Sequence, residues 1–80
     1  MRISILYFAQ FSQDTNIPGE QLEFEPGLSA AELFNQLAKR YRFTLSKDAC
    51  RAAVNETFVD WDHILEDKDT LAFIPPVNGG

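Results

Sequence analysis

One segment of this chain has a strong helical pattern, and segments typical of β-strands lie on both sides of it. Ser29 is the expected N-cap of the helix, and Glu32, three residues later, completes a capping box. Apolar residues then recur at spacings of one, three and four, which places them on one stripe of the helix. They are Leu33, Phe34, Leu37, Ala38 and Tyr41. A helix with one apolar stripe must cover one face of a sheet, so the pattern predicts an α+β fold.

Two strand-forming segments precede the helix. Residues 2–8 are β-branched and aromatic and end at a polar stretch, which is typical of a strand. Residues 21–25 form the second expected strand, with Leu22 and Phe24 on one face. Between them, residues 12–20 are rich in Asp, Asn, Pro and Gly, a composition typical of a turn. The sequence therefore predicts a hairpin before the helix.

Three short strands are expected after the helix. Residues 43–49 are irregular or a short turn, and residues 51–54 and 57–59 are strands on either side of Asn55-Glu56, a tight hairpin turn. Residues 70–74 form the last strand, which ends at two prolines because proline cannot donate to a sheet ladder. The expected order is β-β-α-β-β-β.

The segment between the last two strands is acidic and turn-like, with Trp61 and Leu65 as candidate anchors to the core. Asp60, Asp62, Asp67 and Asp69 imitate the spacing of a metal-binding loop, but the central glycine and closing glutamate of a calcium loop are missing. A solvated acidic face is the favoured interpretation, and contact with a basic partner is the alternative. His63 is interpreted as a turn residue, since no nucleophile or second metal ligand is near it in sequence.

Size and charge limit what the chain can do. Eighty residues make one small domain with little room for a deep active site, so function is expected on its surface or at its ends. The formal net charge of −5 argues against nucleic-acid binding, which needs a basic face. No signal peptide and no apolar run long enough to span a membrane is recognised. Cys50 is the single cysteine and is expected to be structural, with a sulfur relay as the alternative. We therefore expect a soluble, cytoplasmic protein.

Three segments of the chain resemble the β-grasp, ubiquitin-like sulfur carriers, in particular the small subunit of molybdopterin synthase (the MoaD family). They are I-L-Y-F-A-Q at residues 5–10, A-A-V-N-E-T-F-V at residues 52–59, and L-E-D-K-D-T-L-A-F-I-P-P-V-N-G-G at residues 65–80. The family's usual ending is similar to A-F-x-P-P-V followed by a small residue and Gly-Gly. Lys68 stands where the family often has glycine, and Phe11-Ser12 stands where it often has a basic residue.

The resemblance implies a β-grasp fold: a mixed sheet of four to five strands with one main helix packed on one face. It divides the chain into a β-grasp domain at residues 1–76 and a flexible Gly-Gly tail at residues 77–80. It also makes the first and last strands parallel neighbours. By the period of two, side chains of Ile3, Ile5, Tyr7, Leu71 and Phe73 would then face the helix. Those of Leu6, Phe8, Ile74 and Pro76 would face away, and with Pro75 they are the candidate partner-binding residues.

The resemblance further implies that the reactive group is the C-terminal carboxylate of Gly80. A ubiquitin-activating-like partner would adenylate it with ATP, and a sulfur donor would convert the adenylate to a thiocarboxylate. The large subunit of molybdopterin synthase, in a heterotetramer, would then receive the tail formed by Val77, Asn78, Gly79 and Gly80. There sulfur would be donated to the cyclic pyranopterin precursor to build the dithiolene. The chain would thus be a sulfurtransferase only as a subunit, without catalytic side chains of its own.

No cofactor or metal is expected on this chain, because it has neither a phosphate-binding Gly-x-x-x-x-Gly-Lys motif nor a dinucleotide fingerprint. Alternatives stay open within and outside the class. The chain could carry sulfur for thiamine synthesis or tRNA thiolation, or double as a protein modifier. It could also be a ubiquitin-like domain used only for binding, whose terminal glycines are a frayed end.

Overall fold

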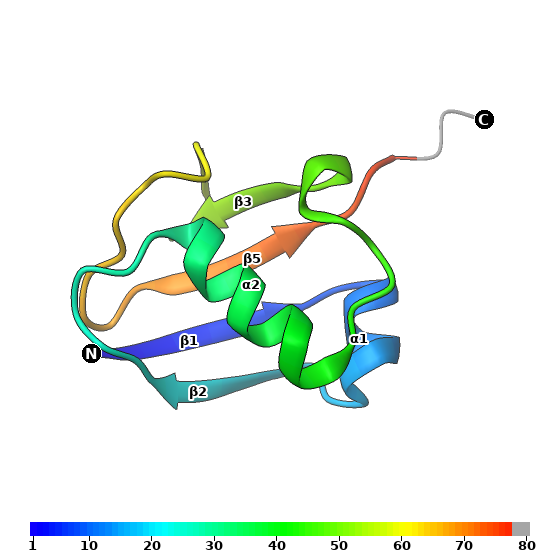
Figure 1. Ribbon diagram of the computed structural model, residues 1–80, viewed down its shortest axis with the longest axis horizontal. Coiled ribbons are helices and arrows are strands. Elements are labelled where there is room, and N and C mark those ends of the chain that lie inside the picture. Colours follow the sequence, from blue (N-terminus) through cyan, green and yellow to red (C-terminus); the bar gives the residue numbers. More distant parts are fainter. Residues whose placement is uncertain (78–80) are drawn as a thin grey trace.

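The computed structural model describes residues 1–77 as a five-stranded sheet with the longer helix, α2, lying across one of its faces (Figure 1). The elements are β1 (Arg2–Tyr7), α1 (Gln10–Thr15), β2 (Gly19–Glu23), α2 (Ala30–Tyr41), the 3₁₀ turn η1 (Lys47–Ala49), β3 (Arg51–Val54), β4 (Thr57–Val59) and β5 (Thr70–Ile74). The strand order is β2-β1-β5-β3-β4, and β1 and β5 are parallel while the other pairs are antiparallel. The predicted mixed sheet, with its first and last strands as parallel neighbours, is confirmed.

Helix α2 begins where its capping residues predict. The Ser29 hydroxyl accepts a hydrogen bond from the Glu32 backbone N–H at 3.1 Å, and the Glu32 carboxylate accepts one from the Ser29 N–H at 3.2 Å. The two bonds satisfy N–H groups that a helix start leaves without partners, so the start is specified locally. The helix ends at Arg42, which adopts a left-handed conformation with φ 57°. Leu33, Phe34 and Leu37 of the predicted stripe are buried, while Ala38 and Tyr41 are partly buried.

The core lies between α2 and the sheet. Its centre is aromatic: the rings of Phe34 and Phe73 lie 5.0 Å apart, centroid to centroid, and those of Phe11 and Phe73 lie 5.6 Å apart. The five sheet residues predicted to face the helix are all buried, each at most 3% exposed. The predicted anchors agree as well, since Leu65 is 2% exposed and Trp61 packs against the core. The parity expected for β1 and β5 is therefore confirmed.

The connection between β1 and β2 differs from the predicted turn. Helix α1 occupies part of it, β1 ends at Tyr7, and β2 starts at Gly19, two residues earlier than expected. Phe11 explains the helix, because its side chain is fully buried in the core. The Asp14 carboxylate adds a tertiary tie by accepting a hydrogen bond from the Thr44 N–H at 3.0 Å. These contacts come from distant segments, so the short polar sequence of α1 does not reveal them.

The predicted tight turn at Asn55-Glu56 is confirmed. Both residues have positive φ, 51° and 70°, as a two-residue hairpin turn between antiparallel strands requires. The Asn55 side chain also joins this turn to β5: its amide donates to Asp69 at 2.9 Å and its carbonyl accepts from the Thr70 N–H at 2.9 Å. The acidic segment before β5 is thereby held against the β3–β4 hairpin.

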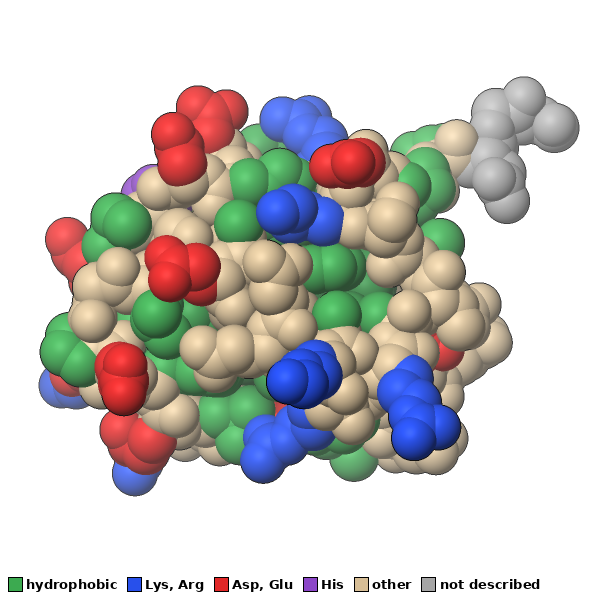
Figure 2. Space-filling model, in the orientation of Figure 1, with side chains coloured by type: hydrophobic (Ala, Val, Ile, Leu, Met, Phe, Trp, Pro, Cys, Tyr) green, Lys and Arg blue, Asp and Glu red, His purple; other side chains and the backbone are tan. Residues whose placement is uncertain are grey.

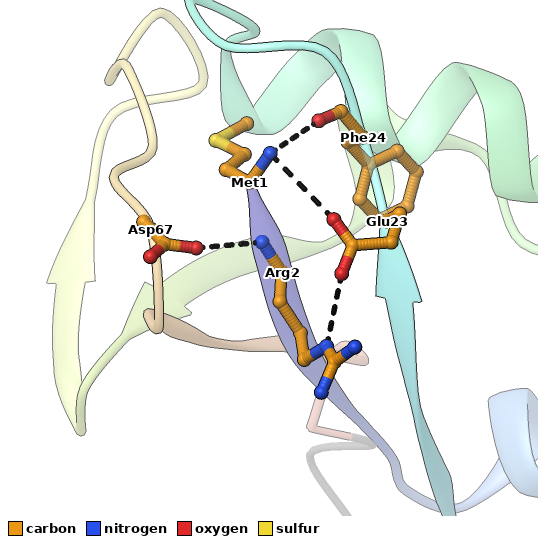
Figure 3. Close-up of polar contacts among 5 residues, drawn as sticks. All are labelled: Met1, Arg2, Glu23, Phe24 and Asp67. Carbon is orange, nitrogen blue, oxygen red and sulfur yellow. Dashed lines mark hydrogen bonds and ion pairs between the residues drawn. The ribbon is translucent and has the colours of Figure 1, made fainter.

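Polar contacts hold the N-terminal end of β1 in place between its neighbours (Figure 3). The Arg2 backbone N–H donates to the Asp67 carboxylate at 2.7 Å, while the Arg2 guanidinium donates to Glu23 of β2 at 2.9 Å. The Met1 ammonium donates to the Phe24 carbonyl at 2.7 Å. These contacts tie the start of β1 to β2 and to the segment before β5, the strand with which β1 pairs on its other side.

Asp67 predicts a pH dependence of stability. The hydrogen bond from the Arg2 backbone N–H holds the pKa of Asp67 below its ordinary value of 3.8. A depressed folded-state pKa contributes stability above the unfolded pKa, and this contribution is lost as pH falls through the folded value. Urea unfolding from about pH 5 to pH 2 should therefore show the advantage of the wild type over Asp67→Asn shrinking below pH 3.8. A difference between the two proteins that stays constant over this range would contradict the prediction.

Lys68 adopts the turn that its neighbours require, but with φ 73°, where a Cβ is unfavourable. Its side chain is exposed, and its N–H donates to the Arg2 carbonyl at 2.8 Å. We expect Lys68→Gly to raise the free energy of unfolding by about 0.5–1 kcal/mol, because the relief of the left-handed strain exceeds the added entropy of the unfolded chain. Lys68→Ala is the control, since it removes the charge and keeps the Cβ. Equal gains for Ala and Gly in urea unfolding would show that charge, not backbone, is the cause.

Candidate functional site

The chain leaves the sheet from the end of β5, a strand that lies between β1 and β3 (Figure 1). Pro75 is partly buried, Pro76 is exposed, and Val77 is 91% exposed. The two prolines limit the conformations of the chain where it departs. Asn78, Gly79 and Gly80, which hold the predicted reactive carboxyl group, lie outside the described residues.

The face of the sheet away from α2 carries a row of small and large side chains. Leu6 of β1 pairs with Ala72 of β5, Ala72 pairs with Ala53 of β3, and Ala53 pairs with Phe58 of β4. All four side chains lie on the same face, because directly paired residues in a sheet share a face. The row therefore has a large side chain at each end and two methyl groups in the middle.

This arrangement makes a groove of about 570 Å³, which we call the open-face groove. Three large apolar side chains are exposed along it: Leu6 at 41%, Phe8 at 46% and Phe58 at 52%. An exposed apolar surface of this kind is a candidate binding site. The groove is lined by Leu6, Phe8, Ala53, Asn55, Glu56, Phe58, Thr70, Ala72 and Ile74.

The structure brings together three of the five predicted partner-binding residues. Leu6, Phe8 and Ile74 all line the open-face groove, on the side of the sheet predicted from parity. Pro75 and Pro76 do not line it but continue directly from Ile74. Sequence reasoning missed Phe58, although the alternation within residues 57–59 could have found it: Val59 packs toward the core and Phe58 points the other way.

The other face is covered by α2 and is different in character (Figure 2). Charged and polar side chains cover much of it, and most acidic ones in this view lie toward the end of the molecule opposite the departing tail. In the sheet, that end holds the Asn55-Glu56 turn and the start of β5. The open-face groove reaches this acidic end with Asn55, Glu56 and Thr70, while Phe8 and Ile74 line it toward the end of β5.

Residues of the acidic segment, 60–69, make hydrogen bonds that hold the local structure. Asp69 accepts a hydrogen bond from the Glu66 N–H at 2.8 Å, and Asp67 accepts the bond from Arg2 already described. Asp60 accepts a hydrogen bond from the His63 N–H through its carbonyl, so His63 closes a turn as predicted. Within residues 1–77, no group of three or more His, Cys, Asp or Glu side chains is placed to hold a metal ion.

Cys50 is buried, with 6% of its surface exposed. Burial raises the pKa of its thiol, which lowers the fraction of the nucleophilic thiolate at neutral pH. It packs in the core together with Ala52 and Val54 of β3. The predicted structural role therefore agrees with its surroundings, and the alternative of a sulfur relay has no exposed thiolate to support it.

A second polar cluster lies inside the domain. The Glu20 carboxylate accepts hydrogen bonds from the hydroxyls of Tyr7 at 2.7 Å and Tyr41 at 2.6 Å. Burial, and then the bond to Glu20, raise the pKa of Tyr7 above its ordinary value, so its hydroxyl stays protonated and donates. The cluster joins β2 to the end of α2 and leaves its polar atoms satisfied, which is a structural role.

None of the helices within residues 1–77 has the length and apolar character needed to span a bilayer.

Comparison with known proteins identifies the family of the chain. The profile of the ThiS family matches residues 5–80. The molybdopterin synthase sulfur carrier subunit of Drosophila melanogaster is 32% identical over 83 residues, covering 100% of this chain and 92% of the relative. That of Escherichia coli K12 is 34% identical over 80 residues, covering 98% and 99%.

Solved structures share the fold. A putative molybdopterin converting factor subunit 1 from Pyrococcus furiosus superposes with a TM-score of 0.81 at 29% identity, covering 95% of this chain and 98% of that one. SAMP1 from Haloferax volcanii gives 0.82 at 15% identity with full coverage of both chains. Subunits 1 and 2 of the molybdopterin-converting factor from Helicobacter pylori form a complex that contains a chain with a TM-score of 0.70 at 21% identity, again with full coverage. The last two likenesses concern the fold alone, whereas the sequence relatives span the whole chain: this protein belongs to the ThiS family, with molybdopterin synthase sulfur carrier subunits among its relatives.

Proposed function

We propose that this chain is the sulfur carrier subunit of a molybdopterin synthase, and that its Gly80 carboxylate carries the sulfur as a thiocarboxylate. One observation supports this most directly. Strand β5 lines the open-face groove through Ala72 and Ile74, and the chain runs on from Ile74 through Pro75-Pro76 to the Gly-Gly end. An apolar docking surface and a glycine-ended arm on one strand suit a protein that binds a partner and delivers its terminus into it.

The carboxylate needs activation before it can accept sulfur. An α-carboxyl group titrates near pH ~3.5, so at neutral pH it is an anion and a poor acyl electrophile. A ubiquitin-activating-like partner would join it to the α-phosphate of ATP, releasing pyrophosphate and giving an acyl-adenylate. A sulfur donor would then displace AMP from the Gly80 carbonyl carbon, which leaves the thiocarboxylate. ATP would be bound by that partner and not by this chain.

Docking would use the open-face groove. Leu6, Phe8 and Ile74 would pack against the large subunit, together with Phe58, and Pro75 and Pro76 would guide the tail from that contact. Burial of apolar surface provides the free energy that ordering the tail consumes. The related subunits of Helicobacter pylori form a two-subunit complex, which supports a large-subunit partner here. With two copies of each subunit the assembly would be a heterotetramer.

The acid, base and oxyanion groups of the reaction would belong to the large subunit. Within the described residues, the open-face groove is apolar apart from Asn55, Glu56 and Thr70, and these lie at the end away from the departing tail. Asn55 already uses its side chain to hold β5. This chain would therefore contribute the sulfur nucleophile through its C-terminus.

A second candidate is a sulfur carrier for another acceptor, or a protein modifier. The chain shares its fold with SAMP1, a small archaeal modifier protein of Haloferax volcanii, and this shared fold is the observation that supports the second candidate. The full-length likeness to molybdopterin synthase subunits at 32% and 34% identity favours the first candidate. Co-purification with a large subunit that binds the pyranopterin precursor would separate the two.

The proposed function is tested by the intact mass of the protein after incubation with an adenylating partner, ATP and a sulfur source. We expect a mass increase equal to the exchange of one oxygen for sulfur, mapped by fragmentation to Gly80. Omission of ATP is the control and should prevent the shift. A carboxylate that stays unmodified under conditions that load a known sulfur carrier would refute the proposal.

A further inference from the structure

An arginine stands beside the open-face groove at the point where the tail departs. Arg51 is the first residue of β3, and its Cα pairs with that of Ile74, the last residue of β5. Its side chain lies on the open face, because Ala53, two residues further along the same strand, lines the groove. The Arg51 cation therefore lies next to the start of the segment from Pro75 to Gly80, which we call the delivery arm.

The guanidinium of Arg51 is held by an aromatic ring. Its central carbon lies 3.8 Å from the centroid of the Phe58 ring, which itself is 52% exposed and lines the groove. Stacking on a ring face restricts the planar group while its N–H donors, which lie in the plane, stay available at its edges. An exposed Arg that is fixed in this way loses less entropy when it binds a second group.

The Arg51 charge is not used within the described part of the chain. The ion pairs in residues 1–77 join Glu23 to the Met1 ammonium and to Arg2, at the far end of β1. The one acidic residue that lines the groove is Glu56, and the register places it at the opposite end, beyond the pair of Val54 and Leu71. Along its length the groove thus has a cation near the tail, an apolar middle and an anion away from the tail.

We propose that Arg51, stacked on Phe58, is a preorganised binding site for a carboxylate side chain of the large subunit. This contact sets the orientation in which the tail enters the large subunit. The inference rests on the proposed function. A guanidinium pairs with a carboxylate through two parallel N–H bonds, which adds direction as well as affinity. Glu56 contributes by repelling the same carboxylate from the wrong end of the groove.

We assign this carboxylate to the large subunit and leave the adenylating enzyme as an outcome of the test. A desolvated charge pair inside an apolar contact mainly slows dissociation. Subunits 1 and 2 of the molybdopterin-converting factor from Helicobacter pylori form a complex, which supports a large-subunit partner for this face.

The test measures the dissociation constant of the complex with the large subunit for wild type, Arg51→Gln, Arg51→Lys and Phe58→Leu at low and high salt. We expect Arg51→Gln to weaken binding about tenfold or more and to flatten the salt dependence. Arg51→Lys keeps the charge but lacks the planar fork, so it should still lose about fivefold. Phe58→Leu keeps apolar area and removes the ring, and should reduce the effect of a subsequent Arg51→Gln change in a double-mutant cycle.

One further variant separates the possible failures. Leu6→Asp reports on the docking face itself, and thermal unfolding confirms that each variant is folded. If Arg51→Gln binds within about twofold of wild type while Leu6→Asp loses binding, the carboxylate binding site is wrong and the docking face stands. If both variants bind normally, the docking face of the proposed function is wrong. If Arg51→Gln slows only adenylation, the assignment to the large subunit is overturned.

Discussion

Removal of Gly80 should abolish sulfur transfer and leave the domain folded. The deletion moves the terminal carboxyl group back by one residue, about 3.3–3.6 Å along an extended chain. A misplacement of ~1 Å in a positioned reaction can cost 100-fold, so we expect at least that loss when loading and delivery are measured together. Val77 is 91% exposed and β5 ends at Ile74, so no sheet contact of the described residues is lost. The melting temperature should therefore stay unchanged.

The measurement is conversion of the pyranopterin precursor by the reconstituted synthase, with loading followed by intact mass. Deletion of Asn78 is the matched control, because it shortens the arm by the same amount and keeps the Gly-Gly end. If the length of the arm is limiting, this variant loses activity as the Gly80 deletion does, whereas a requirement for the Gly-Gly end alone would leave it active. Full activity of the Gly80 deletion would instead support the alternative in which the chain is a binding domain with a frayed end.

Leu6→Asp should weaken the complex with the large subunit by about 100-fold or more. Leu6 lies at one end of the row that forms the open-face groove, and docking would bury the new carboxylate against apolar surface without a partner. Its effect on folding should be small, because Leu6 is 41% exposed in the free domain. Isothermal titration gives the affinity, and urea unfolding checks that stability changes by no more than about 1 kcal/mol.

Ile64→Asp is the matched control for this change. Ile64 is 52% exposed, as large as Leu6, and does not line the groove. It sits in the segment before β5, at the acidic end of the molecule. If both substitutions weakened binding equally, general charge repulsion rather than the open-face groove would explain the loss, and the assignment of the docking face would be wrong.

Much of the fold could be predicted because its signals are local. The capping box of Ser29 and Glu32 acts within one helical turn, and the positive φ values of Asn55-Glu56 follow from turn chemistry. Strand β5 ends where proline removes the donor that a ladder needs. Helix α1 could not be predicted in this way, because burial of Phe11 against Phe34 and Phe73 holds it, and these residues are distant in sequence.

The candidate site divides along the same line. The chain end from Pro75-Pro76 to Gly80 could be picked out in the sequence, and the period of two placed Leu6, Phe8 and Ile74 on the open face. The residues that lie beside these three become visible only in the folded chain. The row from Leu6 through Ala72 to Ala53 depends on the pairing of β1, β5 and β3, which are distant in sequence, whereas Arg51 and Phe58 lie within the β3–β4 hairpin and only their side-chain positions had to come from the structure. Register between distant strands is set by packing of the whole sheet, so no local pattern reveals it.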